Sequence, residues 1–103
     1  MRKFGIPPSF YDAICKKDIT GLRIIMKDSL LVDPTSRQFD AMVDYSRFVK
    51  GLYDSHDGRP LNKDKSSWDD DYMNELMVQV VSNFSRERIN HLKDVVRHIS
   101  RKK

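Results

Sequence analysis

Apolar residues recur every three or four positions through most of this chain, which is the spacing of amphipathic α-helices. The widest apolar face runs from Trp68 to Phe84, so a central helix is expected there. No stretch alternates apolar and polar residues over five or more positions, and no Asn-Gly turn of the hairpin type occurs. The pattern therefore predicts an all-α fold, a compact bundle of about five helices at roughly residues 9–17, 19–30, 34–54, 67–84 and 86–100.

Short polar residues and a proline mark where two of these helices are expected to begin. Asp33 precedes Pro34, whose missing N–H costs nothing at the first position of a helix. Ser66 or Ser67 is the expected cap of the next helix. Between the two helices, residues 54–66 (DSHDGRPLNKDKS) show no periodicity, so they are expected to form a long polar loop.

The 103 residues are 39% hydrophobic and 33% charged, a globular composition that predicts a single helical domain over 1–103. No apolar run approaches the ~20 residues of a membrane span, so no membrane partner is expected. The start, MRKFGIPPSF, lacks the apolar core and cleavage site of a signal peptide. Cys15 is the single cysteine and has no internal disulfide partner. These features predict a cytoplasmic location.

Residues 54–58 contain the strongest candidate for a metal site. Asp54, His56, Asp57 and the glycine that follows resemble the start of a calcium loop, but histidine holds the third position and Lys65 the twelfth. An ordinary turn is the better interpretation. The chain also lacks zinc-ligand spacing, a glycine-rich phosphate loop and a base paired with Cys15. We therefore expect no metal, no cofactor and no enzymatic activity.

Charge is unevenly distributed along the chain, whose net charge is +4. Residues 85–103 hold seven basic and two acidic side chains, whereas residues 54–75 hold seven acidic and three basic ones. The acidic middle and the basic C-terminal segment each indicate a different kind of partner.

The basic C-terminal helix supports one function, the binding of nucleic-acid phosphates. However, no aromatic residues interleave with the cations to stack on bases, and Arg86 and Arg88 lie at a helix N-terminus, where the dipole disfavours cations. A solvated face is the simpler interpretation, and a small nucleic-acid-binding protein is the alternative function. The cations in question are Arg86, Arg88, Lys93, Arg97, Arg101, Lys102 and Lys103.

The segment WDDDYMNEL, residues 68–76, supports the other function, the binding of a basic protein. One or two acidic side chains would suffice to complement the helix dipole, and each such side chain stabilises the helix by roughly 0.3–1 kcal/mol. Three adjacent aspartates repel one another, and such clusters commonly steer a basic partner. Trp68 and Tyr72 would act as anchors if exposed. The expected partner-binding residues are Asp57, Asp64, Trp68, Asp69, Asp70, Asp71, Tyr72 and Glu75.

The segments YDAICKKDITGLRIIMKDSLLVDPTSRQFD and NFSRERINHLKDVV are similar to small immunity proteins of bacterial contact-dependent growth inhibition systems. This resemblance implies that the chain binds and neutralises one cognate toxin domain, often a nuclease, in the cytoplasm. Together with the acidic segment, it leads us to expect a basic toxin domain of the RNase kind as the partner. It implies no residue roles, because these immunity proteins share no functional motif. A helical adaptor whose apolar face completes the core of a partner is a third interpretation.

Overall fold

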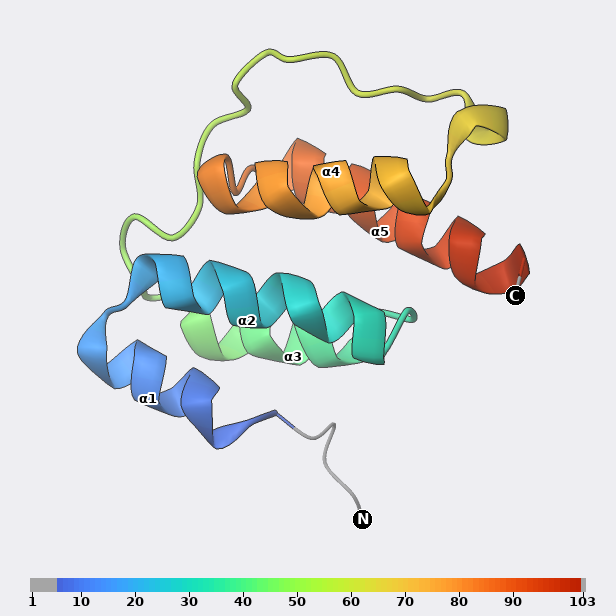
Figure 1. The fold of residues 1–103 in the computed structure, drawn as a ribbon. Helices are drawn as coiled ribbons and strands as arrows, with labels where there is room; N and C mark the ends of the chain where they lie inside the picture. The colour runs from blue at the N-terminus through green and yellow to red at the C-terminus, as the bar shows by residue number, and fades with distance from the viewer. Residues whose placement is uncertain (1–5, 103) are drawn as a thin grey trace. The chain divides into compact units, whose positions relative to one another are not determined.

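The computed structural model describes residues 6–102 and contains five α-helices (Figure 1). The described residues form no β-strand, only an isolated bridge between Asp54 and Ser85, so the all-α prediction is confirmed. Between Leu52 and Tyr53 the chain divides into two compact units, called unit 1 and unit 2 below. The helices are α1 (Pro8–Lys16), α2 (Ile19–Val32), α3 (Arg37–Ser46), α4 (Asp70–Ser82) and α5 (Arg86–Lys102), with a short 3₁₀ helix, η1 (Lys65–Ser67), before α4.

In unit 1, α2 packs against both α1 and α3. The turn into α2 requires two special residues. Lys17 adopts a left-handed conformation (φ 56°) that ends α1, and the Asp18 carboxylate then accepts a 3.0 Å hydrogen bond from the backbone N–H of Gly21. A Cβ atom on Gly21 would lie 2.3 Å from Oδ2 of Asp18, so this capping geometry requires glycine there. The most deeply buried apolar residues of unit 1 are Phe10, Leu22, Met26, Leu30, Phe39, Met42 and Leu52.

The helix expected at 34–54 is shorter than predicted and spans Arg37–Ser46. At its start, the Asp33 carboxylate holds a turn by accepting hydrogen bonds from the backbone N–H groups of Thr35 and Gln38, 3.2 and 3.0 Å long. Ser36, with φ 65°, is the residue from which the helix begins. Pro34 therefore lies in a turn and not at the first helical position.

The same helix also ends earlier than predicted, at Ser46. The Ser46 hydroxyl donates to the carbonyl of Met42 at 2.8 Å, a local bond that competes with helix continuation. Beyond it, the guanidinium of Arg23 donates to the carbonyls of Gly51 and Leu52, at 3.2 and 3.1 Å. Leu52 is buried as its apolar character predicts, but in a turn and not in a helix.

In unit 2, α4 packs against α5. The helix expected at 67–84 spans Asp70–Ser82, and its cap is Asp69 instead of Ser66 or Ser67. Those two serines form η1 inside the segment expected to be loop. The last helix begins at Arg86 as expected. Apolar residues buried in this unit include Leu76, Val80, Phe84, Leu92 and Val95.

Candidate partner-binding surface

The first turn of α4 arranges the three consecutive aspartates in two roles. Asp69 is the N-cap, and its carboxylate accepts a 2.8 Å hydrogen bond from the backbone N–H of Tyr72. Asp70 and Asp71 lie in the first turn, where their charge also complements the helix dipole. Asp69 is therefore used in capping, while Asp70 and Asp71 remain exposed at the surface.

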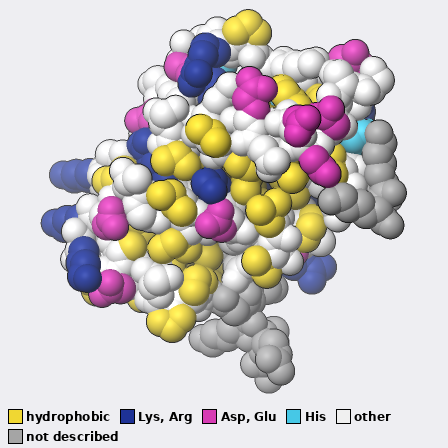
Figure 2. Space-filling model, in the orientation of Figure 1, with side chains coloured by type: hydrophobic (Ala, Val, Ile, Leu, Met, Phe, Trp, Pro, Cys, Tyr) yellow, Lys and Arg dark blue, Asp and Glu magenta, His cyan; other side chains and the backbone are white. Residues whose placement is uncertain are grey.

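One side of α4 is exposed along most of its length. Because its members are spaced by three and four residues, they lie on one face of the helix. Figure 2 shows acidic side chains gathered over the N-terminal half of α4, with hydrophobic side chains among them. We call this surface the acidic face of α4, and its members are Asp70, Asp71, Asn74, Glu75 and Val78.

Val78 distinguishes this face from an ordinary solvated one. Its side chain is 73% exposed, although the positions around it are polar. A scattered exposed apolar residue needs no explanation on its own. Val78, however, lies one turn from Glu75 and two turns from Asp71, so the exposed face places an apolar side chain directly after its carboxylates.

Trp68 does not belong to this exposed surface. Its side chain is only 5% exposed, and its indole N–H donates to the carbonyl of Asn62 at 2.7 Å. The ring packs edge-on against the rings of His91 and His98, with centroid distances of 5.4 and 5.3 Å. Trp68 therefore fastens the loop onto α5, and the predicted role as an exposed anchor is wrong.

Tyr72 has a similar structural use. Its hydroxyl oxygen accepts from the backbone N–H of Asn62 at 3.0 Å and lies 2.8 Å from Nε2 of His91. Burial, together with the positive charges of Lys63 and Arg88, lowers the pKa of His91 despite the opposing effect of Asp94. A neutral His91 whose Nε2 accepts a hydrogen bond from the Tyr72 hydroxyl fits this environment. Tyr72 thus connects loop, α4 and α5.

Asp57 is likewise held inside unit 2 by Arg88. The side chain of Arg88 is fully buried, and its Nη2 donates to Oδ1 of Asp57 at 2.6 Å. The other donors of the guanidinium reach Oε1 of Gln79 at 2.8 Å and Oδ1 of Asn83 at 3.4 Å. We call these four residues the Arg88 network. Because Arg88 is enclosed in it, this cation is not available to nucleic-acid phosphates, contrary to the alternative prediction.

The contacts of the Asp57 carboxylate with Arg59 and Arg88 shift its pKa. Desolvation acts to raise it, but hydrogen bonds from the side chain and backbone of Arg59, then the hydrogen bond and charge of Arg88, outweigh that effect and hold the pKa well below its usual range. Asp64 is also occupied locally. Its carboxylate accepts from the hydroxyl and backbone N–H of Ser66, at 2.7 and 3.1 Å, and these bonds lower its pKa. Both carboxylates therefore stabilise the loop.

Sequence reasoning missed the Arg88 network, although one signal was present. Arg88 lies at helical spacing with Leu92, Val95 and Ile99, on the stripe that the apolar residues of α5 occupy. A charged residue on a buried stripe requires a partner of opposite charge. The sequence offered many acids, so the pairing with Asp57, 31 residues away, could not be selected from it.

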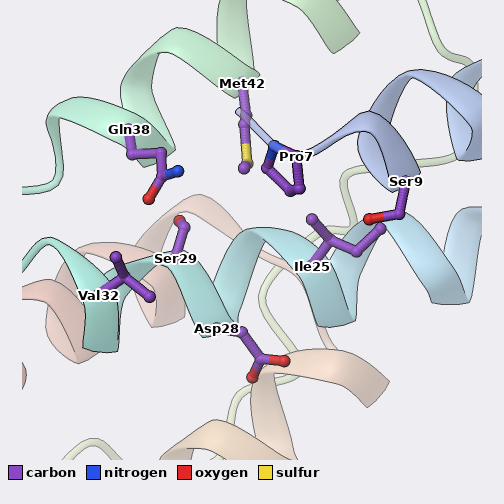
Figure 3. A pocket seen from close by; sticks show the side chains of 8 residues that line it. All are labelled: Pro7, Ser9, Ile25, Asp28, Ser29, Val32, Gln38 and Met42. Carbon is purple, nitrogen blue, oxygen red and sulfur yellow. The ribbon is translucent and has the colours of Figure 1, made fainter. Parts of the chain in front are cut away.

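A separate hollow of about 360 Å³ lies in unit 1 beside α2 (Figure 3). Its wall is largely apolar, with Pro7, Ile25 and Met42 pointing toward one another (Figure 3). Two of its polar groups are already used: the Ser29 hydroxyl donates to the carbonyl of Met26 at 2.6 Å, and Asp28 pairs with a neighbouring lysine. This hollow brings together no set of groups for acid–base or nucleophilic chemistry.

Within residues 6–102, no group of three or more His, Cys, Asp or Glu side chains is arranged to hold a metal ion. In the same part of the chain, no helix combines the length and the apolar character needed to cross a membrane.

No protein-family model, curated protein or solved structure matches this chain.

Proposed function

We propose that this chain is an immunity protein that binds and neutralises a basic toxin domain, a nuclease of the RNase kind, in the cytoplasm. The observation that carries the proposal is the acidic face of α4, where Asp70, Asp71 and Glu75 are exposed around the apolar side chain of Val78. A nuclease must bind a polyanion, so its active-site surface is cationic. A rigid row of carboxylates is complementary to such a surface and would compete with the substrate for it.

The support beneath α4 favours a preformed surface. Asp69 fixes the start of the helix, and α4 packs along α5 through buried residues such as Leu76 and Val80. A surface that is already ordered loses little conformational entropy when it binds, which improves affinity without new contacts.

The acidic face is too small to be the whole interface. A helix of 13 residues is about 20 Å long, whereas a stable interface takes roughly 800 Å² from each partner. The exposed residues 62–67 continue this surface, because Tyr72 ties Asn62 to the start of α4. We assign residues 62–67 to the polar rim of the interface.

Affinity capture with matched charge variants tests the proposal. The tagged chain is expressed in its native cells and purified with and without nuclease treatment, and co-purified proteins are identified by mass spectrometry. The test variant carries Asp71→Asn and Glu75→Gln. The control carries Asp12→Asn and Asp44→Asn, which remove the same charge from exposed positions of unit 1.

We expect one stoichiometric basic protein that survives nuclease treatment, is retained by the control and is depleted by the test variant. Equal capture by both variants would contradict the assignment of the acidic face. Capture that disappears with the nucleic acid would contradict the protein partner and favour the basic helix α5.

A further inference from the structure

A second hollow, of about 200 Å³, lies in unit 2 on the side of α5 that carries its C-terminal cations. The α5 residues that line it recur at i, i+3, i+4 and i+7, so the helical period alone brings them onto one face. The opposite wall comes from η1 and the residue after it. The lining residues are Lys65, Trp68, Asp94, Arg97, His98 and Arg101.

The wall opposite α5 is held in place by a set of short hydrogen bonds. Asp64 caps η1, and the Ser67 hydroxyl donates to the carbonyl of Asp64 at 2.8 Å while accepting from the Asn62 side chain at 2.8 Å. The backbone N–H of Trp68 donates to the carbonyl of Lys65 at 3.2 Å. The buried indole of Trp68 lies edge-on against His98. The backbone that carries Lys65 is therefore fixed relative to the face of α5.

Positive charge in this hollow is not balanced by its own residues. Three cations face one carboxylate, and that carboxylate, Asp94, reaches Arg97 only at 3.9 Å, the distance of a weak surface pair. Over the described chain, neither Lys65 nor Arg101 forms an ion pair. His98 adds a buried Nε2 that has no hydrogen-bond partner in the described structure. A buried polar atom of this kind calls for a missing water, ion or ligand.

We propose that this hollow binds a phosphate group. The three cations and one carboxylate leave a charge of +2, which matches a phosphate monoester at neutral pH. Guanidinium groups bind phosphate oxygens through paired N–H donors, and two of the three cations are arginines. The C-terminal end of α5 carries the equivalent of about half a negative charge, which opposes an anion but is smaller than the +2 of the side chains.

The size of the hollow limits the ligand. Whole small-molecule sites usually measure about 300–1,000 Å³, so 200 Å³ holds a phosphate group while the rest of a larger ligand stays outside. The group can come from inorganic phosphate or from the phosphorylated end of an oligonucleotide. No member of the acidic face of α4 lines this hollow, and Lys65 is the lining residue that it shares with the proposed rim at residues 62–67.

The test is an NMR titration of the ¹⁵N-labelled full chain with inorganic phosphate, with sodium chloride adjusted to keep the ionic strength constant. The chain has one tryptophan, so the indole N–H signal of Trp68 reports on the hollow without ambiguity. We expect saturable shifts of this signal and of the amides from Arg97 to Arg101. Arg101→Gln should weaken binding about tenfold, the effect of losing one charge-assisted hydrogen bond.

Arg86→Gln is the matched control, because it removes one cation from an exposed position of the same helix away from the hollow. It should bind phosphate as the wild type does. Shifts that do not saturate, or that fall equally in Arg86→Gln and Arg101→Gln, would overturn the proposal. A short RNA with and without a 5′-phosphate then separates the two sources. Tighter binding of the phosphorylated RNA that depends on Arg101 assigns the site to nucleic-acid ends, and equal weak binding of both RNAs assigns it to free phosphate.

Discussion

The guanidinium of Arg88 connects three parts of unit 2. It joins Asp57 in the loop to Gln79 on α4 and Asn83 at the junction before α5. Asn83 strengthens the same junction by donating to the carbonyl of Ser55 at 2.8 Å. Since a buried cation is tolerated only with such partners, the loop and the α4–α5 junction depend on each other.

Removing the buried cation of Arg88 should therefore lower the free energy of unfolding. Arg88→Ala leaves the polar groups of Gln79 and Asn83 without their donor and opens a cavity, so we expect a loss of about 3–5 kcal/mol in the free energy of unfolding. Arg86→Ala, at an exposed position two residues earlier, should change it by less than about 0.5 kcal/mol. Urea unfolding followed by Trp68 fluorescence measures both values. Equal small effects would show that the Arg88 network contributes little to stability.

The lowered pKa of Asp57 predicts a pH dependence with a definite sign. In the unfolded chain this carboxyl returns to its ordinary pKa near 3.8, so between that value and the lower folded value the unfolded state binds more protons. The stabilisation is complete above about pH 5 and is lost progressively as the pH falls toward the lower folded pKa. Asp57→Asn should be less stable than wild type at pH 7, with a shallower decline between pH 5 and pH 3. If the urea midpoints of wild type and Asp57→Asn declined in parallel between pH 5 and pH 3, this role of Asp57 would be contradicted.

At the scale of elements, the effect of Asp69 as a helix cap can be measured separately from the effect of its charge. Asp69→Ala removes the acceptor for the Tyr72 N–H and should cost about 1 kcal/mol, whereas Asp69→Asn keeps an acceptor and should remain close to wild type. Thermal or urea unfolding of the two variants tests the difference. If alanine and asparagine proved equally destabilising, the charge of Asp69 and not its cap would be the cause.

Helical periodicity was sufficient to predict the fold class and the order of the helices. It failed at helix ends, because these depend on side chains that compete for backbone groups. Ser46 donates to the carbonyl of Met42 in the last turns of α3, and Arg23 donates to the carbonyl of Leu52 beyond the helix. Asp33 holds a turn where Pro34 suggested a helix start. Apolar spacing continues through Leu52, so no pattern of hydrophobicity alone marks the true end.

The residues of the candidate surface could also be predicted only in part from the sequence. The density of acidic residues before residue 76 was enough, from local sequence alone, to indicate a binding surface at α4. The burial of Trp68 and the pairing of Asp57 depend on His91, His98 and Arg88, which are distant in sequence. Local composition contains no information about which distant side chains will cover or pair with a residue.

At the scale of the whole molecule, the prediction of a single domain has a direct experimental form. Leu22 is fully buried in unit 1, and Leu22→Ala should cost about 2–5 kcal/mol. Trp68 is the one tryptophan and lies in unit 2. If residues 1–103 unfold as one domain, the Trp68 fluorescence and the helical circular dichroism of this variant will shift to the same lower urea midpoint. A Trp68 transition that stays at the wild-type midpoint would mean that the units unfold separately.

The central claim is that the acidic face of α4 guides a basic protein onto this chain. The most direct test is the association rate with the purified partner at increasing salt, for wild type and for the variant with Asp71→Asn and Glu75→Gln. Because steering raises association rates by about 10- to 1,000-fold and is screened by salt, the wild-type rate should fall steeply with salt. The variant should associate at least about tenfold more slowly at low salt, with a flatter dependence. Identical rates and identical salt dependence would contradict the account.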